Sequence, residues 1–156
     1  MRTLIIYASK YGATKKSAEC IANLIADATL CNIGIDNVPA LLDYDCIVIG
    51  SPVAAGNING KIKKFMATNA EELKIKKLGL YLSGFNPSGA EEYITVKNYP
   101  QVIVDAAKAR AIFGGIYDPD NSSFVVKKLL HAITKFDSYT DTIDEEKISE
   151  FVKQLL

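Results

Sequence analysis

The chain has 156 residues, of which 49% are hydrophobic and 23% are charged, the size and composition of one ordinary globular domain. Its 18 basic and 18 acidic residues cancel, so bulk charge gives no argument for binding nucleic acid. No apolar run approaches the roughly 18 residues of a membrane span, and the N-terminus does not resemble a signal peptide. We therefore expect a single domain over residues 1–156, in the cytoplasm.

Apolar runs alternate with helical patterns along most of the chain. Strands are predicted at residues 3–8, 30–35, 46–50, 78–82 and 110–114. The run 3–8 is rich in β-branched residues and continuous rather than alternating, and 46–50 is apolar throughout, as in a parallel sheet covered on both faces. Helices are predicted over residues 14–28, 61–72, 90–96 and 100–107, with a turn or short helix in residues 36–44. This alternation predicts an α/β fold.

Two more helices are predicted after residue 114, where a minimal five-unit fold needs one. The first, residues 122–136, is apolar but carries a basic stripe of Lys127, Lys128, His131 and Lys135. The last has a core-facing pattern at Ile148, Phe151, Val152 and Leu155. Either Thr142 and Glu145 form a capping box at its start, or Asp144 caps it beside an Ile143–Ile148 staple.

The first loop, Ser9-Lys10-Tyr11-Gly12-Ala13-Thr14, places hydroxyl groups and a lysine around one glycine. A tight turn between a buried strand and a helix N-terminus presents free backbone N–H groups, and the helix dipole favours an anion there. In open parallel sheets, ligands bind beyond the carboxyl ends of the strands. We expect the loops 9–14, 51–60 and 83–89 to converge at that edge and hold a phosphate-bearing cofactor.

Several phosphate ligands lack their sequence signature in this chain. The first loop has only Gly12 of a dinucleotide GxGxxG pattern, and the GxxxxGK[ST] loop of nucleotide triphosphatases is absent. A related phosphatase would need a Cys in the first loop, and a phospho-acceptor domain an Asp at a strand end in the crevice. A mononucleotide with a terminal monophosphate remains, and FMN is the leading candidate.

The same loop resembles that of a known family. Ser9-x-Tyr11-Gly12-x-Thr14 is similar to the Ser/Thr-x-Thr-Gly-x-Thr phosphate loop of flavodoxins, with Tyr in the third position. That variant, with Gly50-Ser51-Pro52, resembles the branch that includes menaquinone-dependent protoporphyrinogen oxidase. So do the segment 113–119 and the order of the tail, in which Tyr139-Thr140-Asp141 lies between two helices.

The resemblance implies a flavodoxin-like three-layer sandwich, with five parallel strands in the order 2-1-3-4-5 and an extra helix after the fifth. It also implies FMN-binding loops. The expected cofactor-binding residues are Ser9, Lys10, Tyr11, Gly12, Ala13, Thr14, Ser51, Pro52, Val53, Ala54, Ala55, Gly56, Asn57, Ser83, Gly84, Phe85 and Asn86.

These residues have distinct expected roles. Hydroxyls of the first loop, with charge from Lys10, Lys15 or Lys16, would hold the phosphate. Val53 and Phe85 would flank the flavin ring, while Ala54 and Ala55 leave one face more open. The Gly56–Asn57 peptide is expected to rearrange on reduction and to bond flavin N5, although an ordinary turn would use the same residues.

Single-residue catalysis and metal binding have little support in the sequence. His131 is the one histidine, and the spacing of Cys20, Cys31 and Cys46 fits no metal site, so we expect reduced and mostly buried thiols. No set of residues places a nucleophile in the crevice. Any redox chemistry would belong to the cofactor.

Three functions stay open at this point. The first is an FMN-binding electron carrier that serves a redox protein partner, although flavodoxins are usually acidic and this chain is neutral. The second is an oxidoreductase of the protoporphyrinogen oxidase type that passes electrons to a quinone. Helix 122–136 would then touch the inner face of the cell membrane, or it simply packs on the sheet. Ala54-Ala55 and a shorter, less basic tail depart from that oxidase. The third is a flavin-free binding module.

Overall fold

In the computed structural model, which describes residues 1–85 and 91–156, a parallel sheet has the strand order β2-β1-β3-β5-β6. The bounds of the five strands are Thr3–Tyr7 (β1), Ala28–Asn32 (β2), Cys46–Ala54 (β3), Lys77–Ser83 (β5) and Ala107–Ile112 (β6). The predicted α/β class, the five parallel strands and their order are confirmed.

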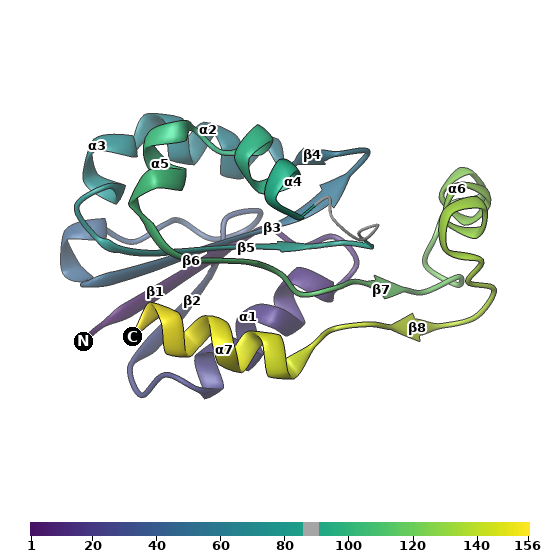
Figure 1. The fold of residues 1–156 in the computed structure, drawn as a ribbon, viewed down its shortest axis with the longest axis horizontal. Helices are drawn as coiled ribbons and strands as arrows, with labels where there is room; N and C mark the ends of the chain where they lie inside the picture. The colour runs from purple at the N-terminus through teal and green to yellow at the C-terminus, as the bar shows by residue number, and fades with distance from the viewer. Residues whose placement is uncertain (86–90) are drawn as a thin grey trace.

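Helices cover both faces of the sheet (Figure 1). The helices α2 (Gly60–Thr68), α3 (Ala70–Leu73), α4 (Glu91–Asn98) and α5 (Gln101–Ala106) lie on one face. The helices α1 (Ala13–Asn23) and α7 (Glu145–Leu155) lie on the other. Alternate residues of β1 enter the two cores, since Leu4 and Ile6 pack toward α2–α5 while Ile5 and Tyr7 pack toward α1 and α7.

One buried tyrosine ties the first turn of α1 to the sheet. Tyr81 is fully buried on β5, and its hydroxyl donates to the Thr14 carbonyl at 2.9 Å. Its ring lies over Gly50 of β3, where any Cβ would overlap the ring. The glycine in the third strand therefore lets the sheet hold the start of α1 in place.

Several predicted boundaries are wrong by a few residues. The helix predicted over 14–28 ends at Asn23, and the strand predicted over 30–35 is Ala28–Asn32. Beyond Asn32 the chain turns, because the amides of Ile35 and Asp36 both donate to the Asn32 carbonyl. The strand predicted over 110–114 ends at Ile112, shortly before the left-handed turn at Gly114 (φ +97°). The helix predicted over 61–72 is divided at Asn69, whose side-chain amide donates to the Phe65 carbonyl.

The region read as a loop after residue 50 contains strand structure. The strand β3 continues to Ala54 and pairs antiparallel with β4 (Asn57–Ile58). The register joins Val53 to Ile58 and Ala54 to Asn57, so a two-residue hairpin turn remains. A short 3-10 helix over Leu41–Asp43 fits the turn or short helix expected there.

A second antiparallel pair carries the extra helix. The strands β7 (Ile116–Tyr117) and β8 (Thr140–Asp141) pair with each other, and α6 (Phe124–Thr134) lies between them in the sequence. We call residues 116–141 the arm, which extends from one end of the sheet (Figure 1). The helix does not pack on the sheet, since none of its residues is buried.

The last helix starts in one of the two ways considered. Asp144 is the N-cap of α7, and its carboxylate accepts from the Lys147 amide at 2.9 Å. The Thr142 hydroxyl instead bonds Gly115, so the Thr142–Glu145 capping box does not form. Within the described residues, no helix is long and apolar enough to cross a membrane.

Candidate functional site

The strand register brings three loops to one edge of the sheet. Tyr7 of β1 pairs with Gly50 of β3, which also pairs with Tyr81 of β5, and Pro52 pairs with Ser83. Because these strands are parallel and end at similar levels, the loops after β1, β3 and β5 meet there. They border a cavity of about 550 Å³.

Most of the residues predicted to bind a cofactor line this cavity. They are Lys10, Tyr11, Ala13, Thr14, Pro52, Val53, Ala54, Ala55, Gly56, Ser83, Gly84 and Phe85. Four others, Ser9, Gly12, Ser51 and Asn57, belong to the same loops but do not line it. Asn86 lies outside the described residues.

The first loop leaves the start of α1 open to an anion. Gly12 is the N-cap with φ +92°, and no side chain caps the helix. The first amides of a helix have no intrahelical acceptor, so those of α1 are free for a ligand. No acidic residue lies in this first turn, and an anion would meet no repulsion from the helix itself.

Two serine hydroxyls at this edge are buried without a partner in the described part of the chain. They are Ser9 Oγ in the first loop and Ser83 Oγ at the end of β5. An unsatisfied buried polar group costs about 1–3 kcal/mol. A ligand oxygen that accepts from either hydroxyl would remove that cost.

The three lysines considered for the phosphate differ in their surroundings. Lys10 lines the cavity, and its ammonium lies 5.0 Å from the centre of the Tyr11 ring. Lys15 lies 3.7 Å from Glu19, one turn along the helix. Lys16 bonds Asp141 of the arm at 2.6 Å. Lys10 is therefore the lysine best placed to add positive charge beside a ligand.

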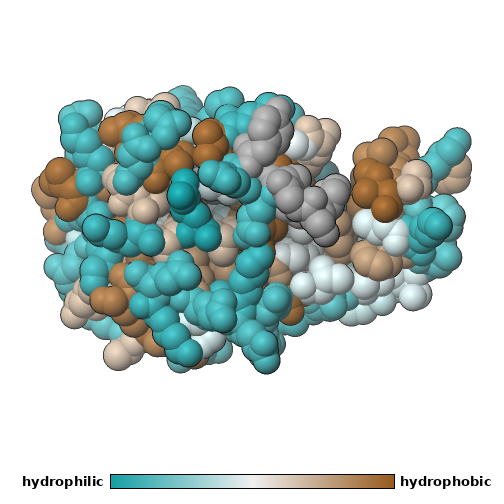
Figure 2. All heavy atoms as spheres, viewed as in Figure 1, coloured by the Kyte–Doolittle hydropathy of each residue, from teal (hydrophilic) through white to brown (hydrophobic). Residues whose placement is uncertain are grey.

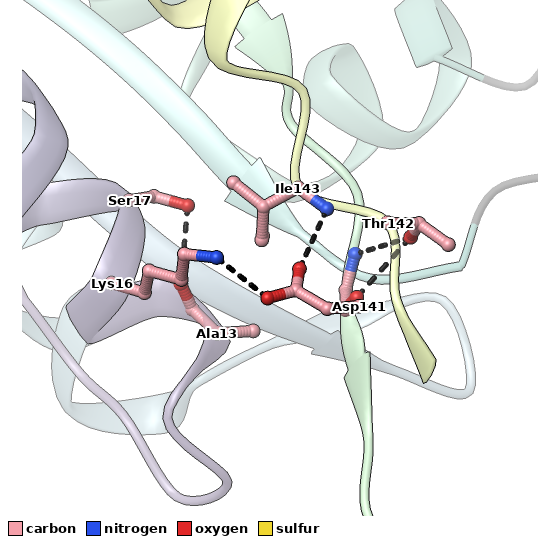
Figure 3. A network of polar contacts seen from close by, with 7 residues as sticks. Ala13, Lys16, Ser17, Asp141, Thr142 and Ile143 are labelled. Atoms are coloured by element: carbon pink, nitrogen blue, oxygen red, sulfur yellow. Dashed lines mark hydrogen bonds and ion pairs between the residues drawn. The ribbon is translucent and has the colours of Figure 1, made fainter. Parts of the chain in front are cut away.

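The Lys16–Asp141 pair fastens the arm to α1 (Figure 3). The Asp141 carboxylate also accepts from the Ile143 amide at 3.0 Å. Partial burial acts to raise the pKa of Asp141, but the bonds from Lys16 and Ile143 outweigh it and hold the pKa below its usual value. Because this pKa is lowered on folding, the pair stabilises the arm above the ordinary carboxyl pKa and is lost as pH falls through the lowered value.

A second contact anchors the same end of the arm. The Gly115 amide donates to Thr142 Oγ1 at 3.0 Å, and the Thr142 amide donates to the Gly115 carbonyl at 2.9 Å. Both residues border the β7–β8 pair, as Figure 3 shows for Thr142. The arm is thus joined at its base to the loop after β6 and to the first helix.

Ser51 has a structural role in this conformation. It is fully buried, and its hydroxyl donates to the Pro52 carbonyl and accepts from the Asn59 amide, each at 2.9 Å. The hydroxyl therefore closes the base of the hairpin formed by β3 and β4. A ligand would bond Ser51 only by breaking one of these contacts.

The side chains expected to flank a flat ring do line the cavity. Val53 comes from the end of β3 and Phe85 from the loop after β5, and Ala54 and Ala55 are exposed, as expected for an open side. The Phe85 ring also meets Phe136 edge-on, with 5.3 Å between ring centres. Phe85 therefore links the cavity wall to the chain just after α6.

The wall formed by the arm was not predicted. Val126, Leu129, Leu130 and Ile133 of α6 line the cavity, together with Ser122 and the residues Gly115, Ile116 and Tyr117. Ile94 and Ile112 also line the cavity and were not predicted. The spacing 126, 129, 130, 133 was the available signal, because it marks one helix face that contacts something. Apolar side chains gather over α6 in Figure 2.

The opposite side of α6 faces away from the cavity. Phe124 and Val125 are 79% and 73% exposed and do not line it, and Lys127, Lys128 and Lys135 are also exposed. Only part of the apolar surface of α6 is thus turned to the cavity, and even Leu129 and Ile133, which line it, stay more than half exposed. Membrane contact stays a prediction.

The sequence and the fold were compared with those of known proteins. A family model described as a flavodoxin domain matches residues 4–144. The chain belongs to the flavodoxin-domain family. A sequence search of curated proteins returns no match.

Solved structures share this flavodoxin-domain fold. Oxidised flavodoxin 1 from Bacillus cereus is 15% identical, with a TM-score of 0.62 over 99% of this chain and 97% of that one. A flavodoxin from the domain Archaea is 17% identical, with a TM-score of 0.61 over 99% and 94%. The flavodiiron core of Flv1 from Synechocystis is 21% identical, with a TM-score of 0.61 over 99% of this chain but 36% of its own. At these identities the likeness is one of fold.

The variant Lys16→Met tests whether the Lys16–Asp141 ion pair holds the arm against α1. A partly exposed ion pair is worth at most about 1 kcal/mol. The amides of β7 and β8 should therefore exchange with solvent up to about fivefold faster at neutral pH.

Lys15→Met is the matched control, because it removes a neighbouring lysine whose partner, Glu19, lies on the same helix. Hydrogen exchange followed residue by residue measures both variants. Equal rates in Lys16→Met and the wild type would show that the pair does not hold the arm.

Proposed function

We propose that this chain is an FMN-binding electron-transfer protein that exchanges electrons through a non-covalently bound flavin. The observation that carries the proposal is the uncapped start of α1 at left-handed Gly12, beside a mainly apolar cavity at the carboxyl edge of the sheet. Such a site combines anion donors with room for a flat apolar group. Membership of the flavodoxin-domain family and the similar flavodoxin structures support it.

The residues of the first loop fit a phosphate group. Free amides at the start of α1 would donate to its oxygens, and the unpaired Ser9 hydroxyl would gain an acceptor. Tyr11 is 43% exposed and keeps its hydroxyl available, while Lys10 adds charge. The hydroxyl of Thr14 is a further candidate donor in the first turn.

The second and third loops fit the flavin ring. Val53 and Phe85 offer apolar surfaces, and the unpaired Ser83 hydroxyl offers a polar contact at the cavity wall. Bound FMN would supply the redox chemistry, and the protein would orient it and set its surroundings. The exposed Ala54 and Ala55 leave a side through which a redox partner could approach.

A second candidate function is favoured by the wall of α6. The apolar face of this helix borders the same cavity, so an apolar small molecule could lie beside the flavin. Such a wall would suit an oxidoreductase of the menaquinone-dependent protoporphyrinogen oxidase type. A quinone would then take the place of a protein partner as electron acceptor.

Replacing Gly12 tests the phosphate assignment. Gly12→Val forces a β-branched residue into a left-handed conformation, although a Cβ there meets nothing within 4 Å. The turn should rearrange and withdraw the amides, and the loss of two charged hydrogen bonds would weaken FMN binding by at least ~100-fold. Quenching of flavin fluorescence measures the affinity.

Gly60→Val is the control, since a Cβ there also meets nothing but the residue is outside the cavity lining and has no positive φ. Unchanged FMN affinity in folded Gly12→Val would contradict the phosphate assignment. If the wild-type protein stays colourless and gains no flavin absorbance on adding FMN, both flavin-dependent functions are excluded. The flavin-free binding module is then the function that remains.

The oxidoreductase candidate is tested by turnover. If it is correct, the FMN-loaded protein should oxidise protoporphyrinogen with a menaquinone analogue, and Leu130→Asp, which places a charge in the apolar wall, should reduce the rate at least ~10-fold without loss of FMN. Absence of turnover, with reduction by a ferredoxin-type reductase intact, rejects the oxidase and leaves the electron carrier.

A further inference from the structure

A buried asparagine at the end of α4 is bonded to the hairpin that borders the cavity. Asn98 is 4% exposed. Its Oδ1 accepts from the Ile58 amide at 3.1 Å, and its Nδ2 donates to the carbonyls of Gly56 at 2.8 Å and Ile94 at 2.9 Å. Both donors and the acceptor of this amide are therefore used, two of them on the hairpin.

The hairpin turn itself is conformationally demanding. Because Ala54 pairs with Asn57, its two central residues are Ala55 and Gly56, and both have positive φ, +49° and +75°. Two-residue hairpins favour such turns with Asn or Gly at these positions, whereas alanine adopts left-handed φ at a cost. Another part of the fold has to hold Ala55 in this conformation. Asn98 can do so, because it bonds Gly56 and Ile58, which follow Ala55 in the hairpin.

The bond from Asn98 argues against the expected rearrangement of the Gly56–Asn57 peptide. Its carbonyl oxygen is bonded to Asn98, so turning this peptide over would leave a buried donor without its acceptor. The central Ala55–Gly56 peptide has no such buried anchor. Its carbonyl accepts instead from the exposed Asn57 side chain at 3.0 Å.

We propose that Asn98 is a positioning residue: it fixes the cavity-lining Ala55–Gly56 turn and so determines which backbone group the protein presents to the flavin. The Gly56–Asn57 peptide keeps its orientation on reduction, and any rearrangement takes place at the Ala55–Gly56 peptide. The flavin part of this inference rests on the proposed function. The bonds that join Asn98 to the hairpin are contacts within the chain and do not depend on it.

The test compares Asn98→Ala with Asn69→Ala. Asn69 also donates its side-chain amide to the carbonyl four residues earlier, Phe65, but it lies outside the cavity lining. Both variants lose this kind of bond, and Asn98→Ala alone also releases the hairpin. In the flavin-free protein, the Ile58 amide should exchange about tenfold faster in Asn98→Ala and at the wild-type rate in Asn69→Ala.

The FMN-loaded protein gives the second readout. The preference of the protein for reduced over oxidised FMN should change about tenfold in Asn98→Ala, a shift of about 30 mV for a two-electron couple, and stay constant in Asn69→Ala. Asn98→Ser, which keeps a hydroxyl near the Ile94 carbonyl, serves if the alanine variant does not fold. Spectroelectrochemical titration measures the potential.

The outcomes separate the positioning role of Asn98 from the proposed binding of FMN. Wild-type exchange at Ile58 in folded Asn98→Ala, or an unchanged potential, overturns the positioning role. Equal shifts in Asn98→Ala and Asn69→Ala overturn it as well, because the effect would then be one of general stability. If the wild type binds no FMN, the proposed function fails, and the exchange rates still decide whether Asn98 holds the turn.

Discussion

The site depends on the register of three parallel strands and on one left-handed residue. Pairing of Tyr7, Gly50 and Tyr81 across β1, β3 and β5 sets the loops after these strands side by side. Tyr81 then holds the Thr14 carbonyl, and Gly12 turns the chain into α1 without a side-chain cap. The free amides of the helix therefore meet the cavity, because sheet, tyrosine and glycine together position the helix start.

The arm gives this flavodoxin domain a second wall around that edge. Its helix buries no residue, yet one apolar face lines the cavity, and its base is joined to α1 by Lys16–Asp141 and to the loop after β6 by Thr142–Gly115. The helix α1 and the arm are thus directly connected. A ligand that fills the cavity would contact both.

The sequence predicted the α/β class and the three converging loops, because continuous apolar runs and Gly-rich loops are local signals. The sheet order came from the resemblance to flavodoxins, and the predicted loops account for about half of the cavity lining. The sequence did not predict the β3–β4 hairpin or the bonds from Asn98 to that hairpin. Both depend on tertiary structure, namely on strand pairing and on a contact between residues 56 and 98. Of the two surfaces considered for α6, the sheet is ruled out because no residue of this helix is buried, and contact with a bilayer stays a prediction. Periodicity marks a buried or contacting face but not what the face contacts.

The central claim is that the first loop binds a phosphate, and the comparison of FMN with riboflavin tests it most directly. The two ligands share the flavin ring and differ in the phosphate group. Titration of the wild type by flavin fluorescence should give an affinity for FMN at least ~100-fold above that for riboflavin, since two or more charged hydrogen bonds are lost without the phosphate. Equal affinities for the two ligands would contradict the account.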